Sequence, residues 1–311
     1  MRVLFWGTPE FAAAPLRALI GESFEVVGVV TQPDKPKGRS RLVTAPPVKE
    51  IAAEEKISCL QPATPKDSEF LGTIEQMRPD ISVVVAYGHI LPKAVIDLPR
   101  LGTLNIHASL LPLLRGAAPI QAAIRQGLSQ TGVTIMRMVP ALDAGPIVLT
   151  ASSPILEDET YGELQLRLSE LGALTLVEAM TLISIGEARE TPQDDSLATY
   201  APKVTREDAR VDWARGTQDV SRAIRAYDPR PGAFTTLNGS DVKLFGARPV
   251  NPGVSAGAAP GTVIEVRDTI AVACPDGAVS ISDVQPAGKV RMRASEWARG
   301  RGVSLGERLG T

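Results

Sequence analysis

The chain has few of the residues that bind metals or form disulfide bonds. Its 311 residues include two cysteines and two histidines. Cys59 and Cys274 are far apart in the sequence and fit neither a disulfide framework nor the spacing of a zinc site. We interpret them as reduced structural thiols, and a metal site built from histidine and cysteine is not expected.

Long hydrophobic segments are also missing. The N-terminal sequence MRVLFWGTPEF turns polar after about five apolar residues, which is too short for the core of a signal peptide. No later segment approaches the roughly 18 uninterrupted apolar residues of a membrane helix. We therefore expect a cytoplasmic protein that does not bind a membrane.

The chain has almost no net charge, formally −2, which excludes a globally basic nucleic-acid-binding protein. The positive charge is nevertheless uneven. One stretch without an acidic residue contains Lys35, Lys37, Arg39, Arg41 and Lys49. This basic stretch can contact phosphate groups locally, or it can be a solvated surface loop, and the stretch alone does not decide between the two.

The length of 311 residues and the hydrophobic share of 44% fit two globular domains. In the first half, strand patterns alternate with helix patterns. The predicted strands are 2–7, 25–30, 81–86 and 103–108, and the predicted helices are 10–19, 48–56 and 119–127. Segments 131–139 and 147–152, joined by PALDAGP, form a predicted antiparallel pair. The pattern predicts an α/β fold with a mostly parallel, doubly wound sheet and an antiparallel edge.

A long helix is predicted to begin at Thr160, where Glu163 completes a capping-box pattern. Its leucines recur at helical spacing and predict a packed face. They are Leu164, Leu168, Leu171 and Leu174.

The composition changes near residue 186. We predict a first domain over 1–188, a polar linker over 189–206 and a second domain over 207–311. The second domain has a helix near 218–227 and then short strands with turns such as Asn238-Gly239, which predicts a small antiparallel β-barrel. It holds 14 Lys and Arg against 12 Asp and Glu, only a slight positive excess.

Asn105 and His107 are the most informative polar residues of the first half. They lie two residues apart on a predicted strand, so their side chains point to the same face near its C-terminal end, where open α/β sheets bind ligands. An amide donor and a group that titrates near neutrality can together hold an oxygen on which negative charge develops. The loss of one such donor typically costs on the order of a hundredfold in rate. The alternative is a core Asn and His bonded to neighbouring backbone.

Other candidates lie in loops. Asp143, in PALDAGP, can orient His107 and favour its charged form, although aspartate is also common in turns. The segment LLRGAAP can admit a substrate closely, or it is a plain connection from strand to helix. His89 follows a strand end, but nothing nearby completes a catalytic pair. GTPEFAAAP lacks the glycines of a dinucleotide-binding fingerprint, so NAD binding is not expected.

Several segments resemble the methionyl-tRNA formyltransferase family. They are LFWGTPEFAAAPLRAL, VVTQPDKPKGR, AYGHILP, NIHASLLPLLRGAAPIQ, MVPALDAGPI, YAPKVTRED, IRAYDPRPGAF and DVQPAGKVRMRASEWARG. The similarity runs in order from residue 1 to about residue 300. The Asn-x-His, SLLP and Asp set is shared with other folate-dependent formyltransferases. VTQPDKPKGR and the second domain point more narrowly to the enzymes that act on tRNA.

The resemblance implies a Rossmann-like formyltransferase domain that binds 10-formyltetrahydrofolate, without a metal. It also implies a C-terminal barrel similar to an oligonucleotide-binding fold, which holds the tRNA backbone. The methionine amine on initiator tRNA attacks the formyl carbon. Asn105 and His107 stabilise the oxyanion, and Asp143 assists His107 and proton movement.

The implied folate contacts are Ser109, Leu110, Leu111, Pro112, Tyr87, Gly88, His89 and Ile90. The implied contacts to the tRNA acceptor stem are Lys35, Lys37, Arg39 and Arg41. We expect the chain to act as a monomer.

Two other functions stay open at this point. A formyltransferase acting on an amino sugar or a nucleotide needs the same Asn105, His107 and Asp143 but not the basic stretch. An RNA-binding protein without enzymatic activity needs none of these three residues, and their presence argues against it.

Overall fold

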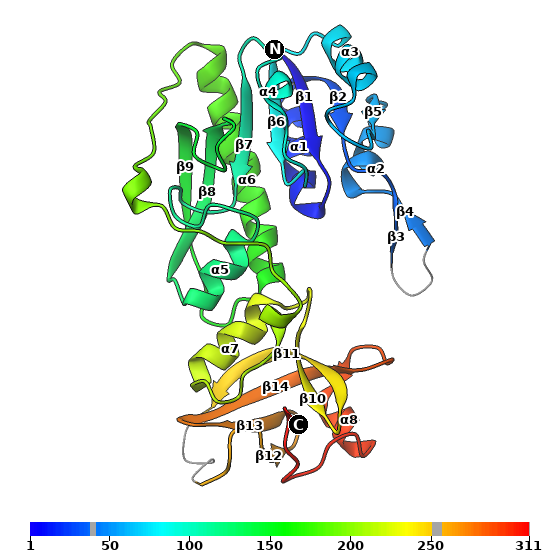
Figure 1. The fold of residues 1–311 in the computed structure, drawn as a ribbon, viewed down its shortest axis with the longest axis vertical. Coiled ribbons are helices and arrows are strands. Elements are labelled where there is room, and N and C mark those ends of the chain that lie inside the picture. Colours follow the sequence, from blue (N-terminus) through cyan, green and yellow to red (C-terminus); the bar gives the residue numbers. More distant parts are fainter. Residues whose placement is uncertain (38–41, 251–256, 311) are drawn as a thin grey trace. The chain divides into compact units, whose positions relative to one another are not determined.

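The computed structural model describes residues 1–37, 42–250 and 257–310. The chain forms two compact units (Figure 1). Unit 1 comprises residues 1–116, 131–153 and 165–201. Unit 2 comprises residues 117–130, 154–164 and 202–311. Two segments that precede residue 165 therefore group with the C-terminal residues.

Unit 1 is built on a sheet in the order β5-β2-β1-β6-β7-β8-β9. Its strands are β1 (Arg2–Gly7), β2 (Glu25–Val30), β5 (Cys59–Leu60), β6 (Ile81–Val85), β7 (Thr103–His107), β8 (Gln130–Arg137) and β9 (Ile147–Pro154). Strands β5, β2, β1, β6 and β7 are parallel, and β8 runs antiparallel to β7. This confirms the predicted mostly parallel sheet with an antiparallel edge.

The helices of this part of the chain are η1 (Glu10–Ala12), α1 (Ala13–Gly21), α2 (Pro47–Glu54), α3 (Ser68–Gln76), α4 (Lys93–Ile96), α6 (Tyr161–Ser184) and η2 (Asp195–Leu197). A hairpin of β3 (Lys35–Lys37) and β4 (Leu42–Thr44) forms a separate two-stranded sheet (Figure 1). Helix α3 was not among the predicted elements, although its signal is present. The Asp67 carboxylate accepts a hydrogen bond from the Phe70 N–H at 2.9 Å and caps the helix.

Helix α6 confirms the predicted capping box and corrects one position of the predicted packed face. The Thr160 N–H donates to the Glu163 carboxylate at 2.9 Å. Leu164 and Leu168 are fully buried, but Leu174 is 70% exposed. An α-helix has 3.6 residues per turn, so the buried face continues from Leu168 to residues near 172, 175 and 179. The predicted leucines advance by only three residues after Leu168, which is less than a full turn each time, and Leu174 therefore lies off the buried face.

Unit 2 is an antiparallel sheet in the order β10-β11-β14-β13-β12, and β15 pairs with β14. Its elements are α5 (Pro119–Gln126), η3 (Glu207–Ala209), α7 (Thr217–Ala226), β10 (Ala233–Leu237), β11 (Ser240–Val250), β12 (Val263–Val266), β13 (Ile270–Cys274), β14 (Gly277–Pro286), β15 (Met292–Arg293) and α8 (Ala294–Arg299). Asn238 and Gly239 both have positive φ, as the predicted hairpin turn requires.

The two edges of this sheet are bridged by the end of the chain. The Leu309 N–H donates to the Gly261 carbonyl, just before β12, at 2.8 Å. The next N–H, of Gly310, donates to the carbonyl of Thr236 on β10 at 2.7 Å. This segment therefore closes the antiparallel sheet into the small barrel that the sequence predicts.

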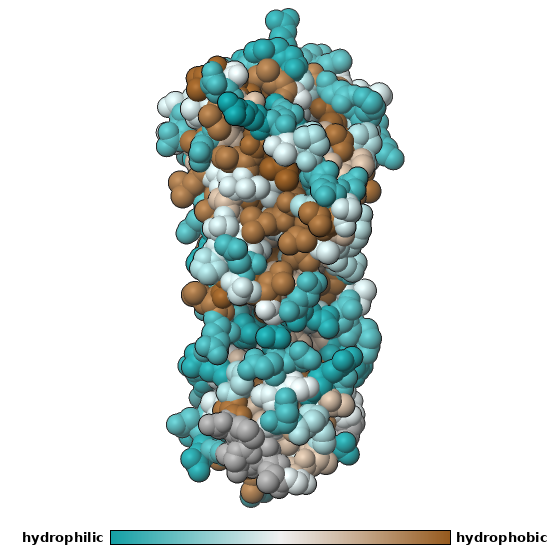
Figure 2. Space-filling model, turned by 90° about the vertical axis from the view of Figure 1, so that its left-hand side faces the viewer, coloured by the Kyte–Doolittle hydropathy of each residue, from teal (hydrophilic) through white to brown (hydrophobic). Residues whose placement is uncertain are grey.

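The surface differs between the two units. On the face shown in Figure 2, hydrophobic side chains gather over unit 1, whereas hydrophilic ones cover most of unit 2. Among the described residues, none of the helices combines the length and the hydrophobicity that a membrane crossing requires.

Candidate active site

Strand β7 carries Asn105 and His107. It pairs with β6 on one side and β8 on the other, and His107 is its last residue. The two side chains share one face of the sheet at the carboxyl ends of the parallel strands, as predicted. Within the described part of the chain, the Asn105 carboxamide makes no hydrogen bond to another protein group. Its donor and acceptor are therefore available to a ligand.

The His107 ring, 5% exposed, faces one backbone oxygen and one carboxylate. Its Nε2 lies 3.0 Å from the Leu114 carbonyl oxygen. Because a carbonyl oxygen can only accept, Nε2 carries the hydrogen and donates it. On the other side, Nδ1 lies 3.7 Å from Oδ2 of Asp143, within ion-pair range but too far for a hydrogen bond.

The surroundings of His107 favour the neutral ring. Burial lowers the pKa of His107 below its usual value near 6.5, because the imidazolium loses its hydration. The negative charge of Asp143 and the Leu114 carbonyl act in the opposite direction but do not overcome burial. With the hydrogen on Nε2, the neutral ring presents an unprotonated Nδ1 that can accept a proton.

Asp143 lies in the loop between β8 and β9. Its φ of 47° is in the left-handed region, and its Oδ2 accepts a hydrogen bond from the Gly116 N–H at 2.8 Å. Two residues later the loop passes so close to the end of β8 that a Cβ on Gly145 would lie 1.8 Å from the Arg137 carbonyl oxygen. Only glycine fits there, so the backbone holds Asp143 in a defined place.

The loop that follows β7 is held by hydrogen bonds to β8 and within itself. The Thr134 hydroxyl donates to the Ser109 carbonyl at 2.7 Å and accepts from the Leu111 N–H at 3.1 Å. The Ser109 hydroxyl donates to the Leu113 carbonyl. Leu114 then adopts a positive φ of 59°, and its carbonyl faces the His107 ring.

Residues 191–201, which we call the strap segment, lie within the predicted linker yet bind along unit 1. Thr191 exchanges two backbone hydrogen bonds with Ile147, both 2.8 Å. The Thr199 hydroxyl accepts from the Leu114 N–H at 2.9 Å. The polar composition of the segment gave no sign of these contacts, because they are made with residues far away in the sequence.

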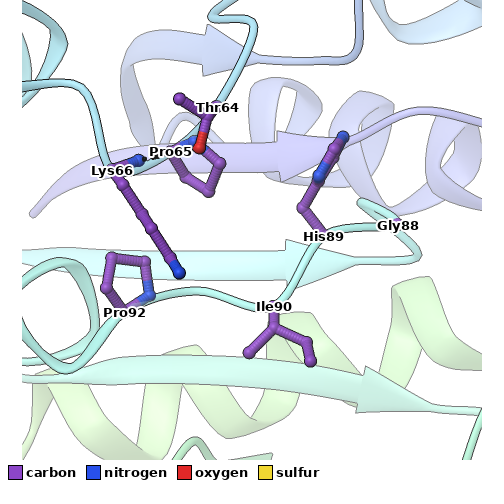
Figure 3. Close-up of a pocket in the computed structure, with 7 residues that line it drawn as sticks. All are labelled: Thr64, Pro65, Lys66, Gly88, His89, Ile90 and Pro92. Atoms are coloured by element: carbon purple, nitrogen blue, oxygen red, sulfur yellow. Dashed lines mark hydrogen bonds between the residues drawn. The ribbon is translucent and has the colours of Figure 1, made fainter.

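Three of the predicted folate contacts line a pocket of about 580 Å³ beyond the end of β6 (Figure 3). Its lining residues are Thr64, Pro65, Lys66, Gly88, His89, Ile90 and Pro92. In Figure 3 the Lys66 side chain extends across the pocket toward the segment of Ile90 and Pro92. Lys66 was not predicted, since its segment has no pattern that links it to the end of β6.

The other predicted folate contacts do not line this pocket. Tyr87 is 2% exposed and packs edge-on against Trp6 in the core. Its carbonyl accepts from the Gln32 carboxamide at 2.9 Å, while its buried hydroxyl has no partner among the described residues. In the loop after β7, Leu110 and Pro112 are half-buried, whereas Ser109 and Leu111 are buried. Their contact to folate stays a prediction.

The basic stretch is only partly described. Lys35 and Lys37 lie on β3, whereas Arg39 and Arg41 lie outside the described residues. Lys49, on α2, is 2.7 Å from the carboxylate of Asp34. This ion pair partly neutralises one of the five positive charges of the stretch.

Unit 2 gathers cations on one side of β10 and β11. The guanidinium groups of Arg206 and Arg210 lie over the Phe234 ring, 5.1 and 4.9 Å from its centre. Lys243 is the cross-strand neighbour of Phe234, and Arg291 lies 4.3 Å from the centre of the Phe245 ring. We call Arg206, Arg210, Lys243 and Arg291 the basic face. The sequence could not show it, because its members come from separate segments.

Among the described residues, the cysteines and acidic side chains outside this site form no cluster that could hold a metal ion. The described residues contain no group of three or more His, Cys, Asp or Glu side chains placed to hold a metal ion. Burial raises the pKa of both Cys59 and Cys274, the latter to about 11. Both are therefore protonated thiols at neutral pH, which suits a structural role.

Comparison with protein families covers most of the chain. Residues 1–180 match the family model described as formyl transferase, and residues 203–302 match the model described as formyl transferase, C-terminal domain. A methionyl-tRNA formyltransferase of Bacillus velezensis is 44% identical over 311 residues, which cover 99% of this chain and 98% of that protein. That of Methylococcus capsulatus is also 44% identical and is covered over its full length.

Solved structures show the same fold. A variant of HypX from Aquifex aeolicus matches 98% of this chain with a TM-score of 0.71 and 23% identity. This chain spans 50% of the length of that HypX chain. WlaRD, a sugar 3N-formyl transferase, matches 93% of this chain with a TM-score of 0.66 and 17% identity. At these identities the likeness shows the fold alone.

The environment of His107 predicts a specific titration behaviour. We expect the pKa of His107 to lie below 6.5 and to fall further in Asp143→Asn, because that variant removes the charge that favours the imidazolium. The asparagine oxygen can still accept from the Gly116 N–H. Long-range ¹H–¹⁵N NMR spectra as a function of pH measure this, and His89→Gln assigns the two histidine signals. A rise of the His107 pKa in Asp143→Asn would contradict the electrostatic interpretation.

Proposed function

Because this chain belongs to the formyl transferase family, we propose that it transfers a formyl group from 10-formyltetrahydrofolate to the amino group of methionine on initiator tRNA. The observation that carries the proposal is the full-length similarity to methionyl-tRNA formyltransferases, over both units. The reaction supports translation initiation, a process of the cytoplasm. We further propose that the chain acts as a monomer, and in support Asn105, His107 and Asp143 all belong to unit 1, so these three residues do not require a second copy.

The reaction needs one proton to leave the amine and one to reach the donor. A bond forms between the methionine nitrogen and the formyl carbon, and the bond between that carbon and N10 of the folate breaks. The methionine nitrogen loses a proton, and N10 gains one. No redox step is involved, so the protein has to supply a proton acceptor, donors for the developing negative charge and a path for the proton.

His107 is the proton acceptor. Its neutral ring keeps the hydrogen on Nε2, bonded to the Leu114 carbonyl, and leaves Nδ1 free. When Nδ1 takes the proton from the amine, the ring becomes an imidazolium with Leu114 on one side and the Asp143 carboxylate on the other. Asp143 lowers the cost of that charge in the buried site.

The same protonation makes His107 a hydrogen-bond donor to the oxyanion. In the neutral ring, the single N–H is on Nε2 and donates to the Leu114 carbonyl. The ring can therefore donate to substrate only after Nδ1 has accepted a proton. The Asn105 carboxamide, on the same face of β7 and without a partner in the described part of the chain, is the second donor. Nδ1, which lies beside Asp143, then releases this proton to N10 of the folate, and the ring becomes neutral again.

The pocket beyond β6 holds part of the folate. Gly88, His89 and Ile90, which the sequence resemblance implies as folate contacts, line this pocket and support the proposal. Lys66 supplies a positive charge that can neutralise the glutamate carboxylates of a folate. Ser109 to Pro112, in the loop after β7, complete the contacts near His107. The co-substrate supplies the formyl group and needs no metal.

Two sets of cations contact the tRNA. The basic stretch, with Lys35, Lys37, Arg39 and Arg41, meets the acceptor stem. The basic face of unit 2 binds backbone phosphates, and its clustered cations support this role although the charge excess of the domain is small. At the surface Arg206 pairs with Asp241 and Arg210 with Glu207, and such exposed pairs are weak enough to exchange a carboxylate for a phosphate.

Single-turnover transfer of labelled formyl from 10-formyltetrahydrofolate tests the function. Methionyl initiator tRNA, methionyl elongator tRNA and free methionine serve as parallel acceptors. We expect label on the initiator tRNA alone. No label on any acceptor, from a protein that still binds the folate, would contradict the proposal and favour an amino-sugar substrate. Asn105→Ala and His107→Ala should each lower the rate by about a hundredfold or more, with little effect on binding.

The basic face predicts a salt-dependent loss of affinity. Lys243→Gln should weaken tRNA binding. It should also reduce the magnitude of the slope of log K against log salt by about one, which is the contribution of one phosphate contact. Arg267→Gln is the matched control, because Arg267 is an exposed cation that follows β12 and pairs with Glu265. Filter binding at several salt concentrations measures both variants. Equal slopes for Lys243→Gln and the unmodified protein would show that the basic face does not hold phosphate.

A further inference from the structure

Gln193, in the strap segment, uses both halves of its carboxamide. Its Oε1 accepts from Nε and Nη2 of Arg115, at 3.1 and 2.7 Å. Its Nε2 donates to the carbonyl oxygens of Asp143 and Gly145, both at 2.8 Å. A guanidinium only donates and a carbonyl only accepts, so these partners define the orientation of the amide.

Arg115 joins this amide to the groups that hold the catalytic pair. Its neighbour Leu114 supplies the carbonyl that accepts from His107, and its other neighbour Gly116 supplies the N–H that donates to Asp143. The Arg115 side chain, 4% exposed, runs to Gln193. Residues 114–116 and Gln193 thus form a closed loop of contacts around Asp143.

The Asp143 loop needs such support. Asp143 is held at positive φ, a conformation that is strained for a residue with a side chain. Its carboxylate is fixed through Gly116, and its own carbonyl is fixed through Gln193. Gly116 itself lies against the strap segment, since a Cβ there would be 2.6 Å from the Ala201 carbonyl oxygen. The strap segment therefore contacts both the Asp143 loop and residues 114–116.

We propose that Gln193 is a positioning residue for formyl transfer, which ties the backbone of the Asp143 loop to Arg115 and so maintains the 3.7 Å separation between Asp143 and His107. This inference rests on the proposed function and extends it to a segment that contributes no catalytic group. Gln193 acts through Asp143, so its loss affects the chemical step rather than substrate binding.

Two variants test different halves of the amide. Gln193→Met keeps the length of the side chain and removes all four hydrogen bonds. Gln193→Glu keeps the acceptor for Arg115 but loses the donors, and it sets a carboxylate against the carbonyls of Asp143 and Gly145. Ser196→Ala is the matched control in the same segment, because the Ser196 hydroxyl bonds only to Asp194 among the described residues.

We expect both Gln193 variants to lower the single-turnover rate by about ten- to a hundredfold, because a catalytic group misplaced by on the order of 1 Å has an effect of this size. The KM values for both substrates should stay within about threefold of those of the unmodified protein. Ser196→Ala should stay within about twofold of the unmodified protein.

The His107 titration separates positioning from general stability. Asp143 is the charged side chain, among the described residues, that raises the His107 pKa. When the Asp143 loop is released, this pKa should fall, in a protein whose melting curve shows that it is folded. A folded Gln193→Met protein with an unchanged rate or an unchanged His107 pKa would overturn the proposal. So would a Gln193→Glu variant with the rate of the unmodified protein.

The titration also distinguishes this inference from the proposed function. If the unmodified protein formylates no tRNA, the proposed function fails, whereas the His107 pKa in Gln193→Met still reports whether Gln193 positions Asp143. If the protein formylates tRNA and the pKa does not move, only the inference about Gln193 fails.

Discussion

The hydrogen bond from His107 Nε2 to the Leu114 carbonyl is the interaction on which the account of the site depends. It is 3.0 Å long and lies in a buried setting, so it decides which ring nitrogen carries the hydrogen. With Nε2 occupied, Nδ1 is the only ring atom that can take a proton from substrate and later donate one to an oxyanion. The role of Asp143 follows, because a carboxylate beside Nδ1 stabilises the ring only after it has accepted the proton.

This arrangement requires backbone geometry that regular secondary structure does not provide. Leu114 and Asp143 both have positive φ, and both belong to loops rather than to the sheet. The sheet positions His107 accurately, but its two partners have to be held by other contacts. For Asp143, Gly116 and Gln193 supply these contacts, and the loop thereby becomes a defined part of the site. The strained conformations are maintained because the surrounding hydrogen bonds over-determine them.

Local patterns in the sequence account for much of the fold. Alternating strands and helices predict the parallel sheet, the period of two places Asn105 and His107 on one face, and Asn238-Gly239 marks a turn of the barrel. What the sequence could not reveal depends on contacts between distant segments. Gln193 meets Arg115 across 78 positions of the chain, and nothing in the polar composition near Gln193 reports a partner. The net charge of the domain does not reveal the basic face for the same reason, because its residues come from separate segments.

The tautomer and protonation state of His107 decide whether Nδ1 is the proton acceptor of the site. With only two histidines in the chain, ¹⁵N chemical shifts of the imidazole nitrogens identify the tautomer of each at neutral pH. We predict that His107 is neutral, with its hydrogen on Nε2 and an unprotonated Nδ1. A neutral ring with the hydrogen on Nδ1 would contradict the account, because Nε2 could then not donate to Leu114 and the proton acceptor toward substrate would be lost.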